Sequence, residues 1–359
     1  MEIPDPSQPS RRAVLKACGG LAASALAASV HAVEAPICAT RVERLAGNPI
    51  VRPGMEARMG HNVQGPSLIR VPHWLPSPLG RYYLYFADHK GAYIRLAFAD
   101  ALEGPWRIHA PGTLRLEQSH FPVKRVAIPA RIDTADPRWT QSAEGVPTPI
   151  DSATLPHIAS PDVHVREDRR EIVMYFHGLA GFRSQHSRVA TSRNGIDFTA
   201  RRPAIARSYL RMLRHDGRWY GLAMPGYLYR SPDGLEDFEE GPQLFPDTMR
   251  HAALLKRGRR LFVFWTRVGD SPEHILLSTV ELDGDWSTWR AGEPQSVLRP
   301  EEPWEGGDLP LAPSVRDAIN VRVRQLRDPA VFQEDGRTYL LYAVAGEAGI
   351  AIARLDLEC

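Results

Sequence analysis

The sequence has almost no net charge, and this argues against functions that need a strongly charged surface. Its 44 Lys and Arg residues nearly balance its 42 Asp and Glu residues, so the formal net charge is +2 over 359 residues. A protein that binds nucleic acid usually presents a strongly basic face, whereas here the arginines are scattered along the chain. We therefore expect no nucleic-acid partner and an ordinary globular chain that is long enough for a large core.

Helical periodicity and metal-binding motifs are also missing. No stretch of convincing length carries the apolar repeat of an amphipathic helix. No HxH or HExxH pair offers the tight ligand spacing of a metal site, although the chain has 13 histidines. These absences favour a β-rich fold with no cofactor, while the histidines leave room for a structural or catalytic divalent cation.

The chain has no apolar run long enough to span a bilayer comfortably, and the nearest approach lies in the first 35 residues. There Arg11 and Arg12 precede the small-residue run "ACGGLAASALAASV", and cleavage sites follow at Ala32 or Ala35. This pattern resembles the twin-arginine export signal of bacteria. We expect residues 1–35 to be a signal peptide, and residues 36–359 to be periplasmic or secreted without a membrane anchor.

Cysteine is scarce as well, and removal of the leader leaves two, Cys38 and Cys359. In an oxidising compartment these two cysteines pair if the fold brings the two ends of the chain together. Two free terminal thiols are the alternative.

What the sequence does have is an internal repeat. Five segments share a short strand, a polar turn that often contains Gly, a second apolar and aromatic strand, and a third strand. Radial stacking of such units buries both faces of each small sheet, and closure of the ring hides the sheet edges. We therefore predict an all-β fold, a five-bladed β-propeller that forms a single domain. The first strands of the repeats begin near Gly65, Ser160, Tyr209, His251 and Asp328.

The last repeat lacks an evident fourth strand. The strand-like segment "RVERLAGNPIV", near Arg41 to Val51, is predicted to supply this strand and close the ring. Two long connections, at about residues 111–156 and 300–325, have no strong strand pattern. Long connections in a compact domain are often functional, so we expect both to rim the mouth of the central funnel.

The repeat pattern resembles the five-bladed propeller glycosidases of the superfamily that contains glycoside hydrolase families 43 and 32. The motif "RDPAVFQEDGRTYLLY" (327–342) carries the resemblance best, and "YIRLAFADALEGPW" (93–106) resembles a blade ending of that group. The resemblance implies an enzyme that acts on a carbohydrate substrate and cleaves a glycosidic bond by acid–base hydrolysis. The chain departs from the family pattern in the first blade, where "HNVQGPSLI" has Gly65 in place of the usual Asp.

Alignment of the repeats predicts a polar ring at the funnel mouth, because the heads of the first strands and the ends of the second strands converge there. Asp328 is the predicted base or charge-tuning carboxylate, with Asp162 as its partner across the funnel and inversion as the favoured outcome. The predicted acid is His251, Glu305 or Asp308. The remaining polar candidates are expected to bind sugar hydroxyls or an acidic sugar: Arg211, Arg250, Arg327, His89, His177, Asn62, Gln64 and Trp304.

Two other functions stay open on the sequence. One is a metal-assisted propeller polysaccharide lyase, which stimulation by a metal ion would favour. The other is a non-catalytic carbohydrate-binding propeller, which binding without turnover would favour. The sequence leaves the sugar, the linkage, the anomer and the oligomeric state undetermined.

Overall fold

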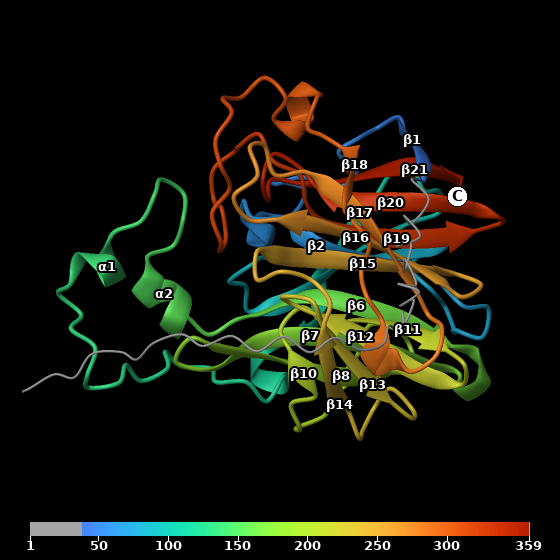
Figure 1. The fold of residues 1–359 in the computed structure, drawn as a ribbon, viewed down its shortest axis with the longest axis horizontal. Coiled ribbons are helices and arrows are strands. Elements are labelled where there is room, and N and C mark those ends of the chain that lie inside the picture. Colours follow the sequence, from blue (N-terminus) through green and yellow to red (C-terminus); the bar gives the residue numbers. More distant parts are fainter. Residues whose placement is uncertain (1–37, 359) are drawn as a thin grey trace, which may run out of the picture. The chain divides into compact units, whose positions relative to one another are not determined.

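The computed structural model describes residues 38–358, which fold into five small antiparallel sheets (Figure 1). These sheets are the blades of a propeller, so the predicted all-β, five-bladed fold is confirmed. The predicted signal peptide, with its arginine pair and its cleavage sites, lies outside the described residues. Within the described range, no helix is long and apolar enough to cross a membrane.

Each blade follows chain order from its innermost strand outward, apart from the last. Blade one contains β2 (Gln64–Arg70), β3 (Tyr82–Ala87), β4 (Tyr93–Ala99) and β5 (Arg107–Arg115). Blade two contains β6 (Ile158–Arg166), β7 (Glu171–Gly181), β8 (Ser184–Ser192), β9 (Thr199–Ala200) and β10 (Ala206–Arg207). Blade three contains β11 (Arg211–His215), β12 (Arg218–Ala223), β13 (Tyr227–Ser231) and β14 (Glu239–Gln243).

Blade four contains β15 (Met249–Arg257), β16 (Arg260–Arg267), β17 (Ile275–Glu281) and β18 (Gln295–Leu298). Blade five contains β19 (Arg327–Glu334), β20 (Arg337–Ala343), β21 (Ile350–Glu358) and β1 (Ala39–Arg44). Innermost strands of neighbouring blades lie against one another, as β2 does with both β6 and β19.

The N-terminal strand closes the ring, as predicted. Strand β1 pairs antiparallel with β21, from Ala39 opposite Glu358 to Arg44 opposite Ala353. Cys38, which directly precedes β1, is disulfide-bonded. Cys359 lies outside the described residues, so its pairing with Cys38 stays a prediction.

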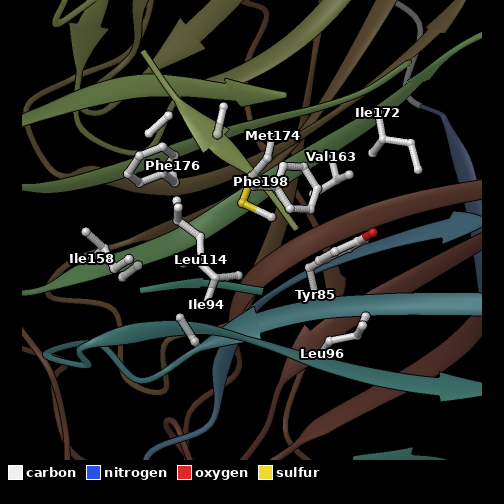
Figure 2. Packing of buried hydrophobic residues seen from close by; sticks show 14 of the residues in the cluster. Tyr85, Ile94, Leu96, Leu114, Ile158, Val163, Ile172, Met174, Phe176 and Phe198 are labelled. Carbon is white, nitrogen blue, oxygen red and sulfur yellow. The ribbon is translucent and has the colours of Figure 1, made fainter. Parts of the chain in front are cut away.

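The apolar faces of neighbouring blades form the core. All six residues of β3 are buried, which is the pattern of a strand covered on both sides. Figure 2 shows Tyr85 and Leu96 of blade one facing Met174 and Phe198 of blade two. The rings of Tyr85 and Phe198 meet edge to face with centroids 5.9 Å apart. The repeated aromatic strands of the sequence therefore fill the wedges between blades.

The heads of the innermost strands share an unusual backbone. Gly65, Ser160, Tyr209 and Asp328 all have positive φ, between 48° and 65°. At three of these heads the strand pairing shifts register, as between Arg327 and Ala330 in β19. Such a bulge redirects the side chain at the head of the strand and is frequent beside functional sites.

Gly65 has a steric reason to lack a side chain. A Cβ atom built there lies 3.0 Å from the Cα atom of Ser160, on the neighbouring inner strand. The contact is tight, so a larger residue at this positive φ would require Ser160 to shift by a few tenths of an ångström. Glycine avoids this cost at the strand head where the resembling family has an aspartate.

The two long connections contain little regular structure. The first holds α1 (Pro137–Thr140) and α2 (Pro149–Thr154), and it extends beyond the strands in Figure 1. The remaining helices are single 3₁₀ turns: η1 (Ala57–Met59), η2 (Leu116–Gln118), η3 (Glu167–Arg169), η4 (Trp286–Thr288) and η5 (Pro303–Glu305).

Candidate functional site

A cavity of about 1540 Å³ lies at the blade heads. Ser160, Tyr209 and His251 line it from the heads of inner strands, and His89 and His177 line it from the ends of second strands. The convergence predicted from the repeats is therefore present. Residues of both long connections line the same cavity, so their predicted position at its rim is also correct.

Tyr209, Asp328 and His251 form a compact group at this cavity. The Tyr209 hydroxyl donates to Asp328 Oδ1 at 2.8 Å, and the tyrosine ring stacks on His251 with centroids 4.8 Å apart. His251 Nδ1 lies 3.3 Å from Asp328 Oδ1. Asp328 is fully buried and is not among the residues that line the cavity, and its Oδ2 atom has no hydrogen-bond partner among the described residues.

Burial sets the protonation of this group. Burial, followed by repulsion from the Glu347 carboxylate, raises the pKa of Asp328 to about 6, although the hydrogen bond from Tyr209 acts in the opposite direction. Burial and the nearby Arg250 guanidinium hold the pKa of His251 well below its usual range. At neutral pH His251 is uncharged and Asp328 is the one acid of the group that titrates near the working range.

Glu347 organises the neighbouring wall and is a residue that the sequence analysis missed. Its Oε1 atom lies 3.0 Å from His89 Nδ1 and accepts from Arg327 Nη1 at 2.9 Å, while Oε2 accepts from Asn62 at 2.6 Å. Burial alone would raise the pKa of Glu347, but His89 and Arg327 outweigh it and lower that pKa below its usual value. Glu347 lies four residues after the end of β20, whereas His89 lies two residues after the end of β3, so alignment of the repeats does not single out Glu347.

The three predicted substrate-binding arginines are buried and already bonded within the protein. Arg250 donates to the carbonyl oxygens of Val315 (3.0 Å) and Asp317 (3.2 Å). Arg327 also donates to the Asp317 carbonyl, at 3.1 Å, so both arginines fasten the second long connection to the blade heads. Arg211 donates to Ala252 O at 3.1 Å and to the Tyr209 hydroxyl at 3.0 Å. Of the three, Arg250 is the one that lines the large cavity.

Asp162 does not line the large cavity. Its Oδ2 atom accepts from the backbone N–H of Met212 at 2.8 Å and lies 2.8 Å from His164 Nε2. It lines a separate cavity of about 330 Å³, which lies along the inner strands. Asp162 therefore links β6 to β11, and its catalytic pairing with Asp328 stays a prediction.

The candidates from the second long connection do not line the large cavity either. Glu305 is fully buried, and its Oε1 atom accepts from Arg44 Nε at 2.8 Å and from the Tyr342 hydroxyl at 2.9 Å. Trp304 packs against the apolar cluster of blades four and five, and Asp308 is exposed. Glu305 thus lies against β1 and β20, and contact of these three residues with a substrate stays a prediction.

The remaining predicted residues lie in or beside the site. Asn62 Oδ1 accepts from the backbone N–H of His89 at 3.0 Å, so Asn62 positions His89. Gln64 is buried, and its Oε1 atom lies 3.5 Å from Ser160 Oγ. His177 lines the cavity, and its Nδ1 atom has no partner among the described residues. Burial and the adjacent His157 keep the pKa of His177 well below its usual range.

Within residues 38–358, no group of three or more His, Cys, Asp or Glu side chains is arranged to hold a metal ion. The site offers the buried carboxyl of Asp328 with a raised pKa, the buried imidazoles of His177 and His251 with lowered pKa values, and the Tyr209 hydroxyl. Such a set exchanges protons with a polyol and forms hydrogen bonds to it.

Comparison with known proteins identifies the fold and the family of this chain. No family model matches the sequence. A glycosyl hydrolase from Bacteroides ovatus superposes with a TM-score of 0.53 at 11% identity, over 88% of this chain and 93% of that chain. A provisionally assigned glycoside hydrolase from Parabacteroides distasonis ATCC 8503 gives a TM-score of 0.54 at 11% identity, over 87% and 95% of the two chains. The chain therefore shares the fold of these two proteins.

One curated relative is similar in sequence as well. The uncharacterized protein R118 of Acanthamoeba polyphaga mimivirus is 36% identical over 343 residues, which cover 88% of this chain and 90% of the relative. Similarity of that extent and level places two proteins in one family, and the chain therefore belongs to the family of the mimivirus protein R118.

Proposed function

We propose that this protein hydrolyses glycosidic bonds of a glycan or oligosaccharide held in the large cavity. The observation that carries the proposal is Asp328, a buried carboxylate whose pKa is raised to about 6 at the head of an innermost strand. An acid–base group is most effective when its pKa lies near the operating pH. The propeller fold shared with a Bacteroides ovatus glycosyl hydrolase supports the same reaction class.

Asp328 acts as the base in this proposal. A water molecule attacks the anomeric carbon and passes a proton to Asp328 Oδ2, the oxygen that has no protein partner among the described residues. Tyr209 holds the other oxygen at 2.8 Å and keeps the carboxylate in place. The glycosidic C–O bond breaks as the water oxygen bonds to the anomeric carbon. Its electron pair goes to the leaving oxygen, which takes a proton from an acid.

His89 is the cavity-lining residue best placed to give that proton. Its Nδ1 atom lies 3.0 Å from Glu347 Oε1, and this contact orients the ring. The lining carboxyls are less suitable. A salt bridge with Arg138 lowers the pKa of Asp136, and one with Arg207 lowers the pKa of Glu240, so both are ionised at neutral pH.

Substrates with good and poor leaving groups distinguish the role of the base from the role of the acid. We would screen glycans and aryl glycosides by product chromatography, with and without chelator, and then compare substrates with good and poor leaving groups. Asp328→Asn is expected to slow both substrates by about 10²–10⁴-fold, the range for one positioned acid–base group. His89→Gln is expected to slow the poor leaving group by a similar factor and the good one much less. A folded Asp328→Asn variant with near-normal turnover contradicts the proposal.

A non-catalytic carbohydrate-binding propeller is the second candidate. The observation that favours it is Gly65, which occupies the strand head where the resembling family has a catalytic aspartate. Tight binding of a glycan without product, under all metal conditions of the screen, would favour this function. Product formation only with a divalent cation would favour the metal-assisted lyase.

A further inference from the structure

The wall of the large cavity carries more positive than negative side chains. Six arginines line it, against four carboxylates, and no lysine joins them. A concave wall with an excess of one charge focuses its field and raises the local concentration of oppositely charged ligands. The protein neutralises some of these arginines with its own carboxylates.

Three of the arginines have carboxylate partners. Arg138 Nη2 lies 2.6 Å from Asp136, Arg207 Nη2 lies 3.1 Å from Glu240, and Arg250 Nη1 lies 3.5 Å from Glu273. Two of the four lining carboxylates, Asp136 and Glu240, belong to these pairs, whereas Glu273 lies outside the lining. Of the other two, Asp317 lies 3.1 Å from Lys90 Nζ. The guanidinium groups of the three arginines are therefore committed within the protein.

Arg131, Arg183 and Arg316 are different, because none of them forms an ion pair with a carboxylate among the described residues. All three are exposed and line the cavity. The Arg183 guanidinium lies 5.7 Å from the ring centroid of Trp139. Arg316 donates to the backbone carbonyl of Asp247 and contacts the sulfur of Met224, both uncharged groups.

The three arginines reach the cavity from separate parts of the chain. Arg131 belongs to the first long connection, Arg183 to the turn between β7 and β8, and Arg316 to the second long connection. Beside Arg183, the Trp139 ring lies 5.5 Å from Phe182 and also lines the cavity. A sugar ring that packs on Trp139 brings its substituents within reach of the Arg183 guanidinium.

We infer that the substrate is an anionic glycan, whose carboxylate or sulfate groups bind the guanidinium groups of Arg131, Arg183 and Arg316. Arginine presents a planar fork of donors that matches both kinds of oxyanion and binds them more strongly than it binds neutral hydroxyls. This inference rests on the proposed function for the cavity and specifies its substrate class.

Matched pairs of ligands test the inference by calorimetry. Uronic-acid oligosaccharides are compared with their carboxyl-reduced neutral forms, and sulfated galactan oligosaccharides with their desulfated forms. Titrations use Asp328→Asn protein so that turnover does not interfere. We expect the anionic member of one pair to bind at least tenfold more tightly, with the preference shrinking as salt is raised.

A triple variant tests whether these three arginines cause the preference for the anionic ligand. Replacement of Arg131, Arg183 and Arg316 by Gln is expected to abolish the preference while the neutral member still binds. The matched control replaces three exposed arginines outside the cavity by Gln, with the same change of net charge, and should keep the preference: Arg169, Arg218 and Arg337.

The outcomes separate this inference from the proposed function. A preference confined to the uronate pair identifies a carboxylate ligand, and one confined to the sulfated pair identifies a sulfate ligand. Equal binding within both pairs, no binding at all, or a preference that survives the triple variant overturns the inference. Hydrolysis of neutral glycans without a preference for anionic ones overturns the inference and leaves the proposed function intact. Preferred binding of anionic glycans without hydrolysis supports the inference and contradicts the proposed function.

Discussion

Tyr209 and Asp328 form a hydrogen-bonded pair in which the hydroxyl stabilises the charged carboxylate. Because this bond lowers the pKa of Asp328, its removal in Tyr209→Phe should raise that pKa above its value of about 6. The acid limb of the pH profile of kcat/KM should therefore move to higher pH, with the rate at neutral pH reduced. The stacking on His251 is kept, because phenylalanine retains the ring.

Tyr93→Phe is the matched control, since Tyr93 is in blade one and does not line the cavity. It should leave the acid limb in place. An acid limb that is unchanged in Tyr209→Phe would show that Asp328 is not the group whose ionisation governs the rate.

The raised pKa of Asp328 also has a consequence for stability. A carboxyl whose pKa is higher in the folded state than its usual 3.8 binds its proton more tightly when folded. Its ionisation therefore lowers the free energy of unfolding as pH rises from about 4 through about 6. Asp328→Asn removes this penalty and, at φ 48°, asparagine tolerates the left-handed backbone.

We therefore expect the melting temperature of Asp328→Asn, relative to the native protein, to rise between pH 5 and pH 8. Calorimetric melts at the two pH values measure this difference. A variant that is destabilised equally at both pH values would mean that Asp328 is retained for a structural bond.

At the scale of elements, η5 shows how a loop carboxylate acquires a structural role. Glu305 accepts from Arg44 on β1, from Tyr342 on β20 and from the backbone N–H groups of Glu301 and Glu302. We expect Glu305→Gln to lower the free energy of unfolding by roughly 1.5–3 kcal/mol, the range for hydrogen bonds to a charged group. Turnover per folded molecule should be retained.

The control is Glu293→Gln, because Glu293 is exposed. A loss of rate without a loss of stability in Glu305→Gln would restore the catalytic assignment of Glu305.

Strand β1 covers the edge of blade five. Deletion of residues 36–44 would leave the N–H and C=O groups of β21 unpaired along its outer edge. We expect a lower melting temperature and concentration-dependent association, measured by calorimetry and size-exclusion chromatography. Cys38→Ser in the full chain is the control that separates loss of the disulfide from loss of the strand. A truncated chain that melts like the full one and stays dispersed would contradict a closing role for β1.

Most of the strands were predictable from the sequence, because the residue patterns that define them are local in the chain. Turn residues and β-branched or aromatic runs recur in each repeat, so the predicted heads at Gly65, Ser160, Tyr209, His251 and Asp328 fall within two residues of the observed strand starts. The left-handed backbone at four of these heads was not predictable, because only close packing between neighbouring blades imposes it.

At the scale of the whole molecule, export remains a prediction of the sequence. Replacement of Arg11 and Arg12 by Lys is expected to keep the protein in the cytoplasm of a bacterial host with a twin-arginine pathway, since that pathway recognises the arginine pair. Fractionation followed by immunoblotting measures the distribution. Replacement of Arg41 by Lys, in the mature chain, should leave it unchanged, and periplasmic recovery of the double variant would remove the twin-arginine assignment.

The number of blades, their order and the closure of the ring follow from the amino-acid sequence, because they depend on strand and turn patterns that are local to each repeat. Which polar side chains share the cavity depends on contacts between blades. Asp162 lies two residues beyond its bulged strand head and bonds the neighbouring strand, while Glu305 folds back onto β1. Glu347 enters the site from a loop that carries no motif. The direction of each of these side chains is set by contacts between blades, which no single repeat encodes.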